Sequence, residues 1–338
     1  MKDMMRQFAS SILVTILATV GAGLLLGPGA ALTTLVLIAI EVAFSFDNAV
    51  INAKILERMS NLWRRLFLTV GMLVAIIGMR LVFPILIVSV TAKVGWRRVV
   101  DLALHQPGQY AHYLDAAHVS ISAFGGGFLL VLVLFFFLDH EREIVWLDRI
   151  ERPLQRLGGA FSVGPLVGAL VISLASFLSR EPAVVFRSGV AGVLLFTAIR
   201  LVIAGLDKLT GASKIGNFVG WGAAVAFVYL EVLDASFSFD GVLGAFAITN
   251  IVPIIALGLG VGALWVRSLT LYMVNEGVLA EYRYLEHGAH YAILVLAVAL
   301  LVSIFVSIPN AVTGIVGLGI IVASIIASRE ANRHYSRR

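Results

Sequence analysis

The chain has no cysteine and little charge. Of its 338 residues 13% are charged and 60% are apolar, and the mean hydropathy is +0.98. Without cysteine there can be neither a disulfide nor a Cys-ligated zinc site. A soluble domain carries roughly twice this charged fraction. The composition therefore excludes an ordinary soluble domain and indicates a protein whose solvent is the lipid bilayer.

Enzyme motifs are also missing. The sequence contains no HExxH helix, no GxSxG turn and no GxxxxGK[ST] phosphate loop. We therefore predict that the protein is not an enzyme, binds no nucleotide and holds no prosthetic group. An intramembrane metalloenzyme is a separate hypothesis, which would require a hydrolysable substrate.

Ten stretches are long and apolar enough to cross a bilayer, which takes about 20 residues. They lie at about 10–26, 30–53, 66–91, 119–138, 159–179, 188–206, 217–241, 248–272, 290–308 and 311–328. The fold class predicted is thus all-α, a polytopic bundle of transmembrane helices. A secretory signal peptide cleaved near Gly27–Ala31 is the alternative for the first stretch. We favour a retained helix, because the second half has a matching span before its own motif.

Basic residues give the orientation. The net charge is +5, but nearly all lysines and arginines lie between apolar stretches, which is a topology signal and not a nucleic-acid face. With ten spans, seventeen of them fall on the side of the N-terminus and five on the other side. This bias predicts a multi-pass membrane protein with both termini in the cytoplasm, and no nucleic-acid partner.

A repeated phrase divides the chain. Residues 41–48 read EVAFSFDN and residues 231–241 read EVLDASFSFDG. The shared FSFD step places Asp47 opposite Asp240 and Glu41 opposite Asp234. The two copies lie on spans two and seven, which run in opposite directions. We therefore predict an inverted repeat with halves 8–180 and 187–330, a plan common among secondary transporters.

Acids at bilayer depth indicate function. A carboxylate there costs several kcal/mol unless it is paired, coordinated or protonated. Oxygen ligands of this kind suit a hard divalent cation. The predicted metal ligands are the acids of both motifs with three neutral neighbours: Glu41, Asp47, Glu231, Asp234, Asp240, Asn48, Ser45 and Ser238. The alternative is that Arg80, Arg200 and Arg267 pair with these acids and only organise the bundle.

Helix geometry adds a constraint. Glu41 and Asp47 are six residues apart, about 240° around an ideal helix, so a regular helix cannot aim both at one point. Asp, Asn, Ser and Gly are poor helix formers. We therefore expect a kink or unwound turn near Asp47–Asn48 and another near Asp240–Gly241.

At these motifs the sequence resembles the TerC family, including its Alx-like relatives. The first motif of that family resembles EVAFSFDN. The second resembles EVLDASFSFDG followed by FAIT, and a glycine-rich span ending in arginine follows each, as at 71–80 and 258–269. Where many members have serine after the second aspartate, this chain has Gly241. The resemblance covers about 80 residues. It implies an inner-membrane exporter of divalent metal ions, usually Mn²⁺, with the five motif acids as ligands.

We therefore predict secondary export of a divalent cation, Mn²⁺ in the first place, with exchange for H⁺ as a route of coupling. An accessory metal-binding membrane protein of a metal-stress or tellurium-resistance complex is the second hypothesis. Protein partners are not predicted. Elsewhere, residues 139–158 read as a cytoplasmic surface helix, residues 92–118 as an amphipathic segment on the outer surface, and His287 and His290 as solvated loop residues.

Overall fold

The computed structural model describes residues 2–91, 93–158, 161–210, 220–246 and 248–335, and every regular element among them is a helix. In chain order the elements are α1 (Lys2–Leu26), α2 (Pro28–Phe44), α3 (Phe46–Leu56), α4 (Asn61–Leu66), η1 (Phe67–Gly71), η2 (Val74–Val82), α5 (Phe83–Thr91), α6 (Trp96–His105), α7 (Pro107–Phe137), α8 (Asp148–Leu157), α9 (Val163–Leu178), α10 (Pro182–Thr210), α11 (Trp221–Phe246), α12 (Val252–Asn275), α13 (Val278–Glu281), α14 (Leu285–Ser303) and α15 (Asn310–Tyr335).

Seven helical stretches of the described chain are long and apolar enough to cross a membrane. They are Phe8–Leu26, Asn61–Val90, Pro107–Phe137, Pro182–Gly205, Val252–Asn275, Leu285–Ser303 and Ala311–Arg333. The bent pair α2 and α3 makes an eighth if it is one span, and α9 is a shorter apolar helix. The predicted all-α, membrane-embedded class is confirmed. The count of ten spans stays a prediction.

The chain forms two compact units, and each takes residues from both ends of the sequence. Unit 1 comprises Met1–His118 and Phe227–Glu276, and unit 2 comprises Val119–Ala226 and Gly277–Arg338. Both acidic motifs lie in unit 1. The division into repeat halves at 8–180 and 187–330 stays a prediction.

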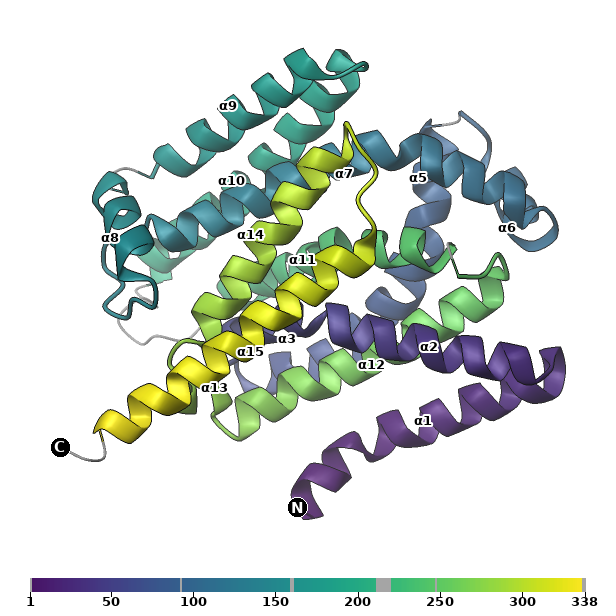
Figure 1. Ribbon diagram of the computed structural model, residues 1–338, viewed down its shortest axis with the longest axis horizontal. Coiled ribbons are helices and arrows are strands. Elements are labelled where there is room, and N and C mark those ends of the chain that lie inside the picture. The colour runs from purple at the N-terminus through teal and green to yellow at the C-terminus, as the bar shows by residue number, and fades with distance from the viewer. Residues whose placement is uncertain (1, 92, 159–160, 211–219, 247, 336–338) are drawn as a thin grey trace. The chain divides into compact units, whose positions relative to one another are not determined.

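In unit 1, α2 packs along α12 with α1 beside them (Figure 1). Two glycines of α12 allow this close approach. A Cβ on Gly258 would lie 2.6 Å from Leu37 Cβ, and one on Gly262 would lie 2.5 Å from Glu41 Cβ. Small residues are what allow helices to pack closely in a bilayer, where burial of apolar surface gives no driving force.

The first motif helix is interrupted, as predicted, but two residues early. α2 ends at Phe44 and α3 begins at Phe46, with a bend of 54° between them. The break falls on Ser45, at φ −103° and ψ 17°. Asp47 instead lies in the first turn of α3, where the partial positive charge of a helix N-terminus stabilises a carboxylate.

The predicted break at Asp240–Gly241 is wrong. α11 runs without interruption from Trp221 to Phe246. A glycine inside a helix costs only about 1 kcal/mol, whereas an unwound turn in lipid leaves backbone groups without partners at several kcal/mol each. The prediction depended on the low helix preference of glycine, which is the weaker of these two effects.

In unit 2, α14 packs against α15, and the segment before α8 is held by Glu151. This fully buried carboxylate accepts the Leu147 N–H (3.1 Å) and lies 3.0 Å from Arg142 Nη2 and 3.3 Å from His287 Nε2. His287 and His290 are both buried in α14, so the prediction of solvated loop residues is wrong. The Phe136 ring packs on both histidines, with its centre 5.3 Å from that of His287 and 3.5 Å from that of His290.

The surface helix expected at 139–158 is confirmed in its second half only, as α8.

Burial alone would raise the pKa of Glu151. The hydrogen bonds from His287 and Leu147 and the charges of His287 and Arg142 outweigh it and lower this pKa below the ordinary value of 4.5.

Candidate functional site

Four motif acids are buried in unit 1. The exposed fractions are 5% for Glu41, 7% for Asp47, 7% for Glu231 and 8% for Asp234. The side chains of Ser238 and Asp240 lie outside the described residues. Both motifs therefore contribute acids to the interior of one unit, where a charge requires a partner.

Glu41 is paired with Arg80. Arg80 Nη2 forms an ion pair with Glu41 Oε1, and Nη1 donates to the Ala75 carbonyl at 2.6 Å. The Ser45 hydroxyl contacts the same carboxylate oxygen at 3.5 Å. Arg80 is carried by the wide π-helical turns of η2, a form that is often found at functional sites.

Glu231 is paired with Arg267. Arg267 Nη2 lies 3.3 Å from both oxygens of Glu231 and 3.7 Å from Asp234 Oδ2. Its Nη1 donates to the Phe67 carbonyl at 2.7 Å, and the guanidinium carbon lies 4.1 Å from the centre of the Phe67 ring. Arg267 therefore contacts two acids, a backbone carbonyl and an aromatic ring.

The two ion pairs are packed crosswise by glycines of the opposite sequence half. A Cβ on Gly71 would lie 2.5 Å from Glu231 Oε1, just as one on Gly262 would lie 2.5 Å from Glu41 Cβ. Each arginine also follows a glycine by nine residues, as Gly71 precedes Arg80 and Gly258 precedes Arg267. Each arginine thus pairs with a glutamate of one motif, but the parts are not repeat equivalents, because Glu231 is the extra acid of the second copy and Gly258 packs on Leu37.

Pairing by arginine, which we treated as the alternative reading, is therefore real for two of the three arginines. Arg200 lies in unit 2, where its guanidinium carbon is 5.2 Å from the Phe135 ring. Two arginines face four described acids, and Asp47 has no cationic partner among the described side chains. Its Oδ1 accepts the N–H of Asn48 at 2.9 Å.

The two motifs meet directly through Asn48. Its Nδ2 donates to Asp234 Oδ1 at 2.8 Å. Three buried oxygen atoms of α3 and α11 have no hydrogen-bond donor among the described residues: Asn48 Oδ1, Asn52 Oδ1 and Asp234 Oδ2, the last of which lies 3.7 Å from Arg267 Nη2. Buried acceptors without a donor are rare, and a bound water or ion would satisfy them.

Sequence reasoning missed Asn52. It is 2% exposed and lies one helical turn after Asn48, so both amides can share a face of α3. The signal was present, since a second asparagine four residues after the motif is unusual in an apolar helix. Asn52 lies outside the first motif, which ends at Asn48.

Carboxylates alone do not complete a metal shell. Among the described residues no group of three His, Asp or Glu side chains could hold a metal ion. Six of the eight predicted ligands divide into Glu41 with Ser45, the chain Asp47–Asn48–Asp234, and Glu231, which is linked to Asp234 through Arg267, and the side chains of the other two, Ser238 and Asp240, lie outside the described residues. The ligand set stays a prediction, and amide oxygens would have to contribute to it.

A family model described as "Protein of unknown function (DUF475)" matches residues 46–335. The chain belongs to this family. No curated protein and no solved structure gives a significant match. The match to the DUF475 family contains Asp47, Asn48, Asn52 and the whole second motif, whereas Glu41 and Ser45 precede it.

Proposed function

We propose that this DUF475 protein is a secondary transporter that exports a divalent cation, Mn²⁺ in the first place, across the bacterial inner membrane. Its site is the cluster of Asp47, Asn48, Asn52 and Asp234 between α3 and α11. The observation that carries the proposal is the set of three buried oxygen atoms without donors at the junction of the two motifs.

The chemistry of these atoms favours a hard cation. Carboxylate and amide oxygens suit Mn²⁺, Mg²⁺ and Ca²⁺, whereas Zn²⁺ prefers nitrogen and sulfur ligands. An uncharged ligand would gain little from Asp47, which is buried without a cationic partner among the described side chains. A divalent ion would satisfy the orphan oxygens and the carboxylate together.

The motif resemblance to the TerC family supports the direction and the ion in this proposal. The basic residues support a cytoplasmic position for both termini. Without a phosphate-binding loop, uphill export would use an ion gradient. Release of the cation would leave carboxylates in a poorly solvated site, which favours their protonation and so exchange for H⁺.

Mn²⁺ flux into or out of proteoliposomes containing the purified protein tests the proposal. We expect flux for the wild type and its loss in Asp47→Asn and Asp234→Asn. Asp101→Asn is the matched control, because Asp101 is a partly exposed α6 acid whose described partners are Arg98 and His105. Binding of Mn²⁺ without flux of Mn²⁺, Mg²⁺ or Ca²⁺, with and without a pH gradient, would favour the accessory metal-binding protein.

A further inference from the structure

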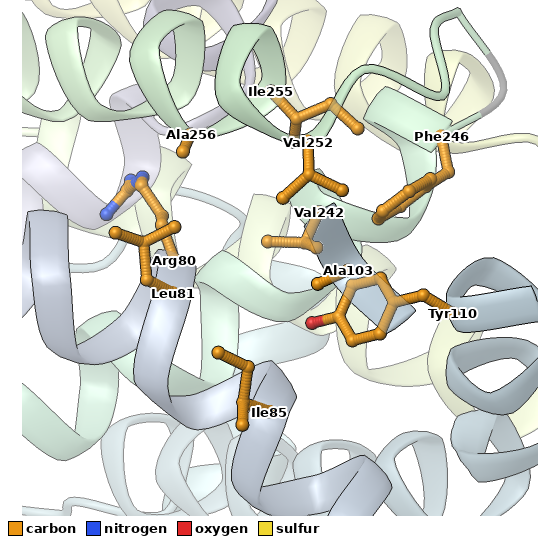
Figure 2. Close-up of a pocket in the computed structure, with 10 residues that line it drawn as sticks. All are labelled: Arg80, Leu81, Ile85, Ala103, Tyr110, Val242, Phe246, Val252, Ile255 and Ala256. Atoms are coloured by element: carbon orange, nitrogen blue, oxygen red, sulfur yellow. The ribbon is translucent and has the colours of Figure 1, made fainter. Parts of the chain in front are cut away.

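A small pocket of unit 1 has one charged side chain, Arg80, in its lining. Its cavity volume is about 20 Å³, which is room for about one water molecule. Figure 2 shows Arg80 on one side and the Tyr110 ring on another, with the Tyr110 hydroxyl pointing into the pocket. The remaining lining is apolar: Leu81, Ile85, Ala103, Val242, Phe246, Val252, Ile255 and Ala256.

Arg80 lies between this pocket and Glu41. It lines the pocket, is 5% exposed, and pairs with Glu41 on its other side. Gly241 of α11 lies on the same boundary, because a Cβ there would be 3.0 Å from Glu41 Oε2 while the next residue, Val242, lines the pocket. An ion could pass between pocket and Glu41 only if the guanidinium moved.

The pocket lies toward the outer ends of its helices on the predicted topology. It is lined by the last residues of α11 and the first of α12, whereas Asp234 lies earlier in α11 and Arg267 lies later in α12. Tyr110, which is 3% exposed and 5.9 Å from the ring centre of Phe246, covers it. The apolar lining makes the pocket a poor path for an ion until it hydrates.

We infer that this pocket is the outer half of the ion path and that Arg80 is its gate. The inference rests on the proposed transport function. In this conformation the guanidinium neutralises Glu41 and repels cations, so the outer path is closed. Since Glu41 cannot remain charged and unpaired, Arg80 can leave it only when a cation or a proton takes its place. Opening of the outer path is thereby linked to the binding of a cation or a proton at Glu41.

The two arginines differ in what holds them. Arg267 is fixed by Glu231, the Phe67 carbonyl and the Phe67 ring. Arg80 is held by Glu41 and the Ala75 carbonyl, and its buried Nε has no hydrogen-bond acceptor among the described residues. An incompletely satisfied guanidinium costs less to move, which assigns the moving part to Arg80.

The absence of cysteine makes the test clean. Ala256→Cys places the sole thiol in the pocket, and a membrane-impermeant cationic thiol reagent is added to the outer side of oriented vesicles. We expect slow labelling with Arg80 in place, and labelling at least about tenfold faster in Arg80→Gln, because a buried ion pair has been removed. Arg80→Lys should remain slow. Gly108→Cys, where a side chain meets nothing within 4 Å, reports constant access.

A second measurement tests the gate with Arg80 intact, in case Arg80→Gln does not fold. Labelling of Ala256→Cys with Arg80 intact should accelerate when Mn²⁺ is loaded inside, and complete labelling should stop export. Equal labelling rates with and without Mn²⁺, labelling from the cytoplasmic side only, or unaltered flux after complete labelling would overturn the gate. Failure of the transport proposal looks different, since unlabelled wild type then shows no flux even where labelling depends on Arg80.

Discussion

Residues of one chemical type have different roles in unit 1. Glu41 and Glu231 are each paired with an arginine, whereas Asp47 has no cationic partner among the described side chains. A buried ion pair contributes little net stability, so the main effect of these two pairs is charge balance. The carboxylate of Asp47 is balanced by no cation among the described side chains.

A substitution at Asn52 distinguishes an effect on metal binding from an effect on folding. Its buried Oδ1 accepts no hydrogen bond from the described residues, so Asn52→Leu removes a potential metal ligand while it removes an unsatisfied polar atom. We expect Mn²⁺ affinity to fall about tenfold, since an oxygen ligand is lost, and metal-free thermal stability to stay within about 1 kcal/mol or rise. Isothermal calorimetry and thermal unfolding in detergent measure both. Reduced stability with unchanged affinity would refute the role of Asn52 as a ligand.

Gly262 is required by the position of Glu41. Gly262→Ala would place a methyl group 2.5 Å from Glu41 Cβ, so we expect a loss of stability of about 1–3 kcal/mol from overpacking and loss of flux. Gly21→Ala in α1 is the control, because its Cβ meets nothing within 4 Å, and it should gain up to about 1 kcal/mol. Equal melting temperatures for the two variants would contradict the close packing of α2 on α12.

At the scale of elements, the break between α2 and α3 decides which side chains meet. The 54° bend at Ser45 lets Glu41 face Arg80 while Asn48 contacts Asp234 of α11. A straight helix would point the two acids about 240° apart. The continuous α11 needs no bend, because Glu231 and Asp234 are three residues apart and share a face.

The segment before α8 depends on ionised Glu151. Because the folded-state pKa of this group is lowered, its contribution to stability is present above the ordinary pKa of 4.5 and is lost as pH falls below it. We expect the hydrogen-exchange protection factors of residues 142–157, which correct for the intrinsic pH dependence of exchange, to fall below that pH. In Glu151→Gln the protection factors should be low already at pH 7 and should not fall further with acidification.

Glu143→Gln is the matched control for this element, since Glu143 is an exposed acid of the same segment. Its exchange profile should follow that of the wild type at every pH. An acid response that persists in Glu151→Gln would assign the pH dependence to another group.

At the scale of the whole molecule, α7 is the helix on which the predicted orientation is tested. Single cysteines at Gly108 and Glu143 lie near opposite ends of this apolar helix. In intact cells we expect an impermeant thiol reagent to label Gly108→Cys, and Glu143→Cys only after the membrane is opened, because the basic residues place the second position in the cytoplasm. Labelling of both from outside, or the reverse pattern, would contradict the predicted topology.

The sequence by itself determined the membrane class, the acids within apolar stretches and the recurring phrase, because each depends on local composition. The tertiary structure alone decided which arginine meets which acid, the position of the break at Ser45, the continuity of α11 and the inclusion of Asn52. These features depend on contacts between residues up to 200 positions apart, such as Arg267 with Phe67, and on the small free-energy differences between a bent and a straight helix. Local preference does not contain those terms.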